Sequence, residues 1–200
     1  MRNLFIFLIP FTLLLNFLLI LWREPQFLGK GGTFRYLYYL LITYFGTFII
    51  EMIGVNTGVL FGNYTYGYGL GWKVFGTPLL IGVNWIVLLL GSARIATLIA
   101  EKLGKEQPNK IKFLLRIFTG AMLMVLYDLV LEQVAPLMQM WSWNGGEPPL
   151  QNYLMWFFLS IIFHAYYVWG RFLQKERISS WIFILQYLFF VVIYLGIRFI

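Results

Sequence analysis

The chain has 200 residues, of which 60% are hydrophobic, 20% aromatic and 12% charged, and its formal net charge is +7. Soluble proteins carry about 25% charged residues, so this composition excludes an ordinary water-facing domain and predicts one transmembrane domain over residues 1–200. The chain has no cysteine, which excludes disulfides and thiol chemistry, and its single histidine argues against a multi-histidine metal site. We therefore expect no metal site.

Apolar segments recur along the chain from its first residues. A membrane-spanning helix needs about 20 largely apolar residues. The first segment is not typical of a cleaved signal peptide, because its apolar run is long and no small-residue cleavage site follows. We predict an all-α integral membrane protein, a bundle of six transmembrane helices at residues 4–22, 35–55, 77–100, 112–136, 152–170 and 179–198.

The loops between these segments alternate in charge. Basic side chains gather in the first, third and fifth loops, whereas the second loop has only Lys73 and the fourth has none. The positive-inside rule then places the odd loops in the cytoplasm, and the termini and even loops on the other side of a bacterial cytoplasmic membrane. This use of the charge indicates a lipid bilayer, not nucleic acid, as the partner. The basic residues are Arg23, Lys30, Arg35, Lys102, Lys105, Lys110, Lys112, Arg171, Lys175 and Arg177.

The second and fourth loops are rich in glycine and aromatic residues. They read TGVLFGNYTYGYGLGWKVFGTP and PLMQMWSWNGGEPPLQNY. One interpretation is a pair of aromatic turns at the membrane surface. The other is two caps that close over one cavity, since irregular backbone at membrane depth must be buried in protein.

Three carboxylates fall within predicted spans: Glu51, Asp128 and Glu132. Charged groups inside a bilayer are costly and commonly mark function. Asp128 and Glu132 are four residues apart and share one helix face. If the second and fourth spans are neighbours, all three acids converge beneath the two aromatic loops.

Desolvation and mutual repulsion oppose the ionisation of all three acids together. One carboxyl therefore stays protonated beside a carboxylate. These two groups can serve as the acid and the base of general acid–base catalysis on an apolar substrate. Alternatively, the acids only hold helices together by pairing with Arg94, His164 or backbone groups. The spacing of Asp128 and Glu132 also resembles magnesium motifs of diphosphate chemistry, but a second motif and outer cations are missing.

Other polar and aromatic side chains could complete such a site. His164 could pass protons to Asp128, although a structural hydrogen bond between helices is the favoured interpretation. Asn84 should face the bundle, where it would position water or bind a neighbouring helix. Aromatic faces could stabilise a carbocation, or simply pack; the candidates in and beside the loops are Tyr64, Tyr66, Trp141, Trp143 and Trp156.

Two runs of residues resemble a known family. The first is Glu51-x-x-Gly54, Gly58, Phe61-Gly62-x-Tyr64-x-Tyr66, Leu70-Gly71, Gly76-x-Pro78 and Asn84-Trp85, and the second is Asp128-Leu-Val-Leu-Glu132, Ala135, Trp141-x-Trp143, Pro149 and Asn152-x-x-x-Trp156. Over residues 35–170 their order and spacing resemble bacterial and archaeal carotenoid biosynthesis proteins of the carotenoid 1,2-hydratase type, which include the bisanhydrobacterioruberin hydratases. Gln133 departs from the proline that often follows the glutamate in that family.

The resemblance implies a cofactor-independent hydratase that adds water to the terminal 1,2 double bond of an acyclic carotenoid ψ-end, giving a tertiary alcohol. In this hypothesis Asp128 protonates carbon 2, and Glu51 or Glu132 deprotonates the incoming water. Association with other membrane enzymes of the pathway is a further expectation. The side chains expected to contact substrate are Tyr64, Tyr66, Asn84, Trp85, Trp141, Trp143, Asn152, Trp156 and His164.

Two alternatives remain open at this point. A carotenoid end-group cyclase of the lycopene type needs similar residues, because it also protonates an alkene. A non-enzymatic lipid carrier or proton-coupled transporter would also use intramembrane acids, although no inverted repeat of interrupted helices is visible.

Overall fold

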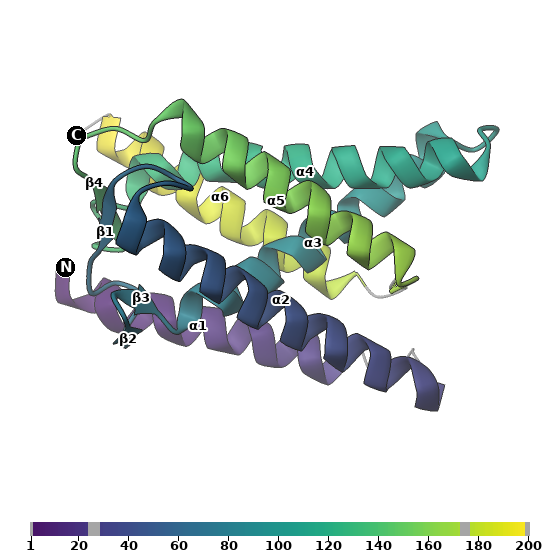
Figure 1. The fold of residues 1–200 in the computed structure, drawn as a ribbon, viewed down its shortest axis with the longest axis horizontal. Coiled ribbons are helices and arrows are strands. Elements are labelled where there is room, and N and C mark those ends of the chain that lie inside the picture. The colour runs from purple at the N-terminus through teal and green to yellow at the C-terminus, as the bar shows by residue number, and fades with distance from the viewer. Residues whose placement is uncertain (1, 24–28, 173–176, 199–200) are drawn as a thin grey trace.

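The computed structural model describes residues 2–23, 29–172 and 177–198, which leaves the predicted loop residue Lys175 outside the described residues. The described residues form six helices that run side by side along the long axis of the molecule (Figure 1). This arrangement agrees with the predicted all-α fold. The helices are α1 (Arg2–Arg23), α2 (Gly29–Thr57), α3 (Leu80–Leu103), α4 (Asn109–Val134), α5 (Leu150–Trp169) and α6 (Ile178–Arg198).

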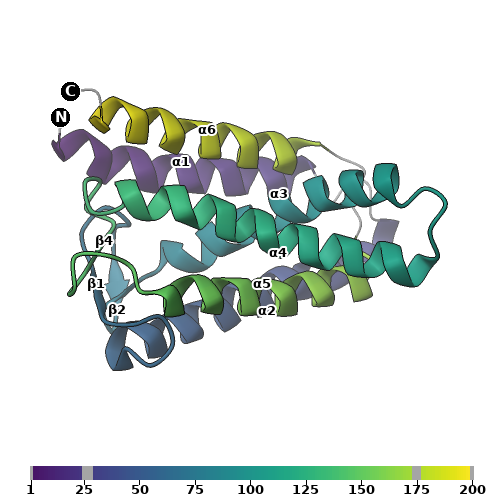
Figure 2. The same cartoon turned by 90° about the horizontal axis from the view of Figure 1, so that it is seen from above.

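Helix α3 lies at the centre of the bundle and contacts the five other helices. Nearly every residue between Ile81 and Thr97 is buried. A helix that is apolar on all sides is stable only where neighbours surround it, which explains why this segment takes the central place. Figure 2 shows α3 behind α4, with α1 and α6 on one side and α2 and α5 on the other.

Four stretches of helix are long and apolar enough to cross a membrane: Gly32–Thr57, Leu80–Leu103, Asn109–Val134 and Ile178–Gly196. Helix α1 contributes a shorter apolar stretch, Ile9–Trp22. Large apolar side chains such as Phe45, Phe118 and Val192 are exposed on the outside of the bundle, as expected of a lipid-facing surface. The protein therefore has the character of a membrane protein, with four helices that meet the requirements of a span where six were predicted.

The second and fourth loops join in one cap, here called the aromatic cap, made of residues 58–79 and 135–149. Its strand β1 (Tyr64–Tyr66) pairs antiparallel with β4 (Trp141–Trp143), in a register that sets Tyr64 opposite Trp143 and Tyr66 opposite Trp141. A second short pair, β2 (Lys73–Val74) with β3 (Thr77–Pro78), extends the first loop. Helix α1 begins and α6 ends at this same end of the bundle (Figure 1).

Backbone contacts continue the pairing beyond the strands. The Gly67 N–H donates to the Met140 carbonyl at 2.9 Å, and the Gly69 N–H donates to the Gln139 carbonyl at 2.7 Å. A Cβ atom at Gly67 would lie 2.2 Å from the Gln139 oxygen. The two loops can approach this closely only because glycine stands at that position. The interpretation of the loops as caps over one region is thus the one that the fold supports, although the strands themselves were not predicted.

Candidate active site

Glu51 lies near the end of α2, buried beneath the aromatic cap. Its Oε2 accepts hydrogen bonds from the hydroxyls of Tyr64 (2.8 Å) and Tyr66 (2.7 Å). Its Oε1 accepts a hydrogen bond from the indole Nε1 of Trp85 at 2.9 Å. Three neutral donors therefore point at one carboxylate, and such donors stabilise its ionised form.

Glu132, in the last turns of α4, is bound by the other half of the cap. Its Oε2 accepts from the indole nitrogens of Trp141 (3.0 Å) and Trp143 (2.7 Å). Its Oε1 accepts from the amide nitrogen of Asn152, on α5, at 3.1 Å. Each strand of the cap thus supplies two donors to one acid.

The alternation of side chains along the two strands explains this division. Successive side chains of a strand point to opposite faces. In β1 the two tyrosines are buried and Thr65 is exposed, and in β4 the two tryptophans are buried and Ser142 is exposed. The sequences Tyr-Thr-Tyr and Trp-Ser-Trp therefore turn all four polar aromatics toward the acids.

Asp128 lies one helical turn before Glu132 on the same face of α4 and is fully buried. Its Oδ2 accepts a hydrogen bond from Asn152 at 2.9 Å, so that Asn152 donates to both acids. Its Oδ1 has no hydrogen-bond partner in the described part of the chain. Asp128 consequently has one hydrogen bond where Glu51 and Glu132 each have three, so its ionised form is the least stabilised of the three.

A small cavity separates Glu51 from Glu132. Its volume is about 20 Å³, which is room for about one water molecule. Trp85 and Trp156 stack beside it, with ring centroids 4.2 Å apart and an interplanar angle of 21°. The lining residues are Glu51, Phe61, Tyr64, Tyr66, Ile81, Glu132, Trp141, Trp143, Asn152 and Trp156.

The two cap tyrosines remain hydrogen-bond donors near neutral pH. Burial, and then the negative charge of Glu51, raise the pKa of Tyr64 and of Tyr66 above that of a free tyrosine. Both hydroxyls therefore keep their protons. They hold the Glu51 carboxylate in place without competing for its negative charge.

Two of the residues predicted at this site lie elsewhere. Asn84 faces a second cavity on another side of α3. His164 donates from Nδ1 to the Ser160 carbonyl (2.8 Å), and its Nε2 lies 3.0 Å from the Ser92 hydroxyl. The contact that His164 could have made with Asp128 is therefore not formed, and its contact with Ser92 links α5 to α3, as the favoured interpretation had it.

Two lining residues were not among the predicted contacts. Phe61 stands within the first run of the family resemblance, which is a signal that could have identified it. Ile81 precedes Trp85 by four residues and so shares its helix face. Nothing in the type of residue marks Ile81 as part of a polar site.

The fold and the site define an all-α protein of membrane type, in which an aromatic cap holds a cluster of buried carboxylates. The chain belongs to the carotenoid biosynthesis protein family, whose family model matches residues 5–200. Neither the curated proteins nor the solved structures contain a match to the chain. Family membership supports a role in carotenoid formation and a carotenoid as the substrate.

Proposed function

We propose that the protein is a carotenoid 1,2-hydratase, which adds water to the terminal double bond of an acyclic ψ-end to give a tertiary alcohol. The observation that carries the proposal is the water-sized cavity between Glu51 and Glu132, beside a third buried acid that has few hydrogen bonds. Hydration needs a proton donor, a bound water and a proton acceptor. The three carboxyls and the cavity can provide them without a cofactor.

Asp128 is assigned as the proton donor. Three carboxyls in a medium of low dielectric constant cannot all be ionised at modest cost, and Asp128 has the least support for a negative charge. In the proposed step the alkene π electrons take the proton of the Asp128 carboxyl, so that a C–H bond forms at carbon 2. A tertiary cation then remains at carbon 1, and Asp128 becomes a carboxylate.

Glu132 is assigned as the base and Glu51 as a fixed negative charge. Water in the cavity attacks carbon 1, and one of its protons passes to Glu132. Asn152 binds both acids, so this pair is placed for return of the proton to Asp128. Glu51 is saturated with donors and opposes the positive charge of the intermediate, together with the faces of Trp85 and Trp156.

The state described here is closed to the substrate. A cavity of about 20 Å³ holds a water but not the branched end of an isoprenoid chain, and Asp128 is not among its lining residues. The cap and Asn152 must therefore shift when the alkene enters. One such movement would both widen the cavity and uncover Asp128, while the polyene stays in lipid.

The same cavity favours hydration over cyclisation. A cyclase must keep water away from its cation and must fold a longer part of the polyene inside the site. Here two carboxylates border a water-sized space. We therefore propose hydration, and the experiment below also distinguishes it from cyclisation.

The cap is proposed to face the non-cytoplasmic side of a bacterial cytoplasmic membrane. Exposed basic side chains such as Lys102, Lys105 and Lys110 lie at the opposite end of the bundle, in the α3–α4 connection. The positive-inside rule places that end in the cytoplasm. In this orientation all six helices span the membrane, and water reaches the site through the cap.

The test is expression in cells that accumulate lycopene, followed by mass analysis of the extracted pigments. A hydratase increases the mass of the pigment by one water per reacted end, a cyclase leaves the mass unchanged but alters the absorption spectrum, and a carrier changes neither. Unchanged mass with wild-type protein present in the membrane would overturn the proposal.

A further inference from the structure

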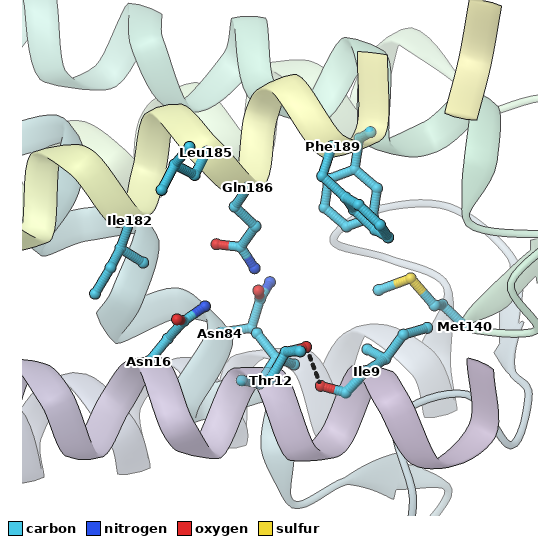
Figure 3. Close-up of a pocket in the computed structure, with 11 residues that line it drawn as sticks. Ile9, Thr12, Asn16, Asn84, Met140, Ile182, Leu185, Gln186 and Phe189 are labelled. Carbon is cyan, nitrogen blue, oxygen red and sulfur yellow. Dashed lines mark hydrogen bonds between the residues drawn. The ribbon is translucent and has the colours of Figure 1, made fainter. Parts of the chain in front are cut away.

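A second cavity, which none of the three carboxylates lines, lies between α1, α3 and α6 (Figure 3). Its volume is about 220 Å³, roughly ten times that of the acid site. Most of its wall is apolar, with Leu13, Met140 and Phe190 among the lining residues. The described residues that line it are all uncharged.

Three carboxamide side chains point into this cavity from three different helices: Asn16 from α1, Asn84 from α3 and Gln186 from α6 (Figure 3). The Oε1 atom of Gln186 is buried and has no hydrogen-bond partner within the described ranges. Asn84 is only 3% exposed. A buried amide oxygen without a partner is costly, so Gln186 Oε1 and the convergence of two further amides on one cavity point to a ligand that forms hydrogen bonds there.

The chemistry of the wall defines the ligand. Carboxamides both donate and accept hydrogen bonds without carrying charge, so they match an uncharged hydroxyl better than a carboxylate or phosphate. The hydroxyl hydrogen would satisfy Gln186 Oε1, while its oxygen would accept from an amide N–H. Because the remaining wall is apolar, the hydroxyl must belong to an apolar body.

The cavity admits one end of such a molecule. Its lining residues Leu185 and Phe189, both on α6, are also substantially exposed, with 63% and 41% of their surfaces accessible. A long chain can therefore extend from the cavity past α6 toward lipid. This opening suits a polyene whose end group alone is enclosed.

Residues that are adjacent in the sequence contribute to the two sites. Asn84 faces the second cavity while the next residue, Trp85, binds Glu51 in the acid site. Met140 lines the second cavity while the next residue, Trp141, binds Glu132. On two separate segments, the residues that bind the acids therefore adjoin residues that line the second cavity.

We propose that the carboxamide cavity binds the hydroxylated end group of the carotenoid product. The choice of this alcohol rests on the proposed function, whereas binding of an apolar alcohol by the three amides stands on the cavity alone. Binding there would remove the tertiary alcohol from the acids, which could otherwise protonate it and reverse the reaction.

The test is a binding titration with the purified full-length protein in nanodiscs. The probes are a 1-hydroxy carotenoid and lycopene, which differ by one hydration, and binding is followed by the shift of polyene absorbance. Wild type should bind the alcohol about tenfold more tightly than lycopene, because a tenfold change in affinity is close to the largest net contribution of one hydrogen bond. Gln186→Met and Asn84→Leu should remove this preference and leave lycopene affinity unchanged.

Gln107→Met, an exposed glutamine in the α3–α4 connection, is the matched control and should keep the preference. Equal affinity of the wild type for the two probes would overturn the inference, and so would a preference that survives both cavity variants. A straight-chain fatty alcohol that competes as strongly as the hydroxy carotenoid would overturn the isoprenoid assignment. Failure of the proposed function would appear separately, as unchanged pigment mass in cells.

Discussion

Tyr64 and Trp143 lie opposite each other in the β1–β4 pair, with ring centroids 5.0 Å apart, yet they bind different acids. The Tyr64 hydroxyl donates to Glu51, and the Trp143 indole donates to Glu132. The strand pair thus ties α2 to α4 through their carboxylates. Separation of the strands would leave both acids without most of their donors at once.

Asp128→Asn and Glu132→Gln should each reduce the formation of hydrated carotenoid by at least about a hundredfold, because each removes a proposed acid or base. Glu51→Gln should act in the same direction by removing the fixed charge. Pigment mass analysis in lycopene-producing cells measures the effect. Glu147→Gln, the same chemical change at an exposed position of the cap, should leave product formation unchanged. Near-normal hydration by Asp128→Asn would remove that residue from the mechanism.

Asn152→Leu should destabilise the protein by about 1–3 kcal/mol, since it leaves Asp128 and Glu132 without their shared amide donor. Thermal unfolding in detergent measures the loss. Asn144→Leu, at an exposed position in the same cap, should stay within about 0.5 kcal/mol of wild type. An unchanged melting temperature for Asn152→Leu would show that the shared amide does not stabilise the acid pair.

Tyr66→Phe should cost about 1.5–3 kcal/mol of stability, because the hydrogen bond that it removes is made to a charged carboxylate. In the Glu51→Gln background the same change should cost only about 1 kcal/mol, the value for a neutral pair. The double-mutant cycle isolates this difference. Equal costs in both backgrounds would mean that Glu51 carries no charge in the folded protein.

Gly67→Ala should weaken the aromatic cap, since its Cβ would lie 2.2 Å from the Gln139 carbonyl oxygen. Both the melting temperature and the yield of hydrated pigment should fall. The matched control is Gly145→Ala, because a Cβ there meets no atom within 4 Å. Equal behaviour of the two variants would contradict the close approach of the loops.

Much of the bundle could be predicted from the sequence, because long apolar runs determine helices whatever their partners. Helix depth predicted that Glu51 lies near the α4 acids only on the condition that the second and fourth spans are neighbours. The strands could not be predicted, since three residues give too short a pattern and Thr65 pairs with Ser142, 77 positions away. The alternation in Tyr-Thr-Tyr and Trp-Ser-Trp was nevertheless visible in the sequence. It explains why the two tyrosines bind Glu51 and the two tryptophans bind Glu132.

The sequence could not predict which side of α3 Asn84 lies on. Helix α3 is buried on nearly all sides, and its few polar residues are buried with the apolar ones, so its sequence has no exposed polar face from which its rotation could be inferred. His164 was uncertain for a different reason. Its partner Ser92 also donates to a backbone carbonyl of its own helix, as serine does in many helices, so nothing distinguished it as a histidine partner.

The cap also constrains how the protein is made. One of its strands precedes α3 and the other follows α4, so the ribosome must complete both helices before the two can meet. The three donors of Glu51 all precede α4 in the chain, whereas Glu132 must await Trp141, Trp143 and Asn152. The complete cluster of three acids and their donors therefore cannot form in a nascent chain that has inserted only its first half.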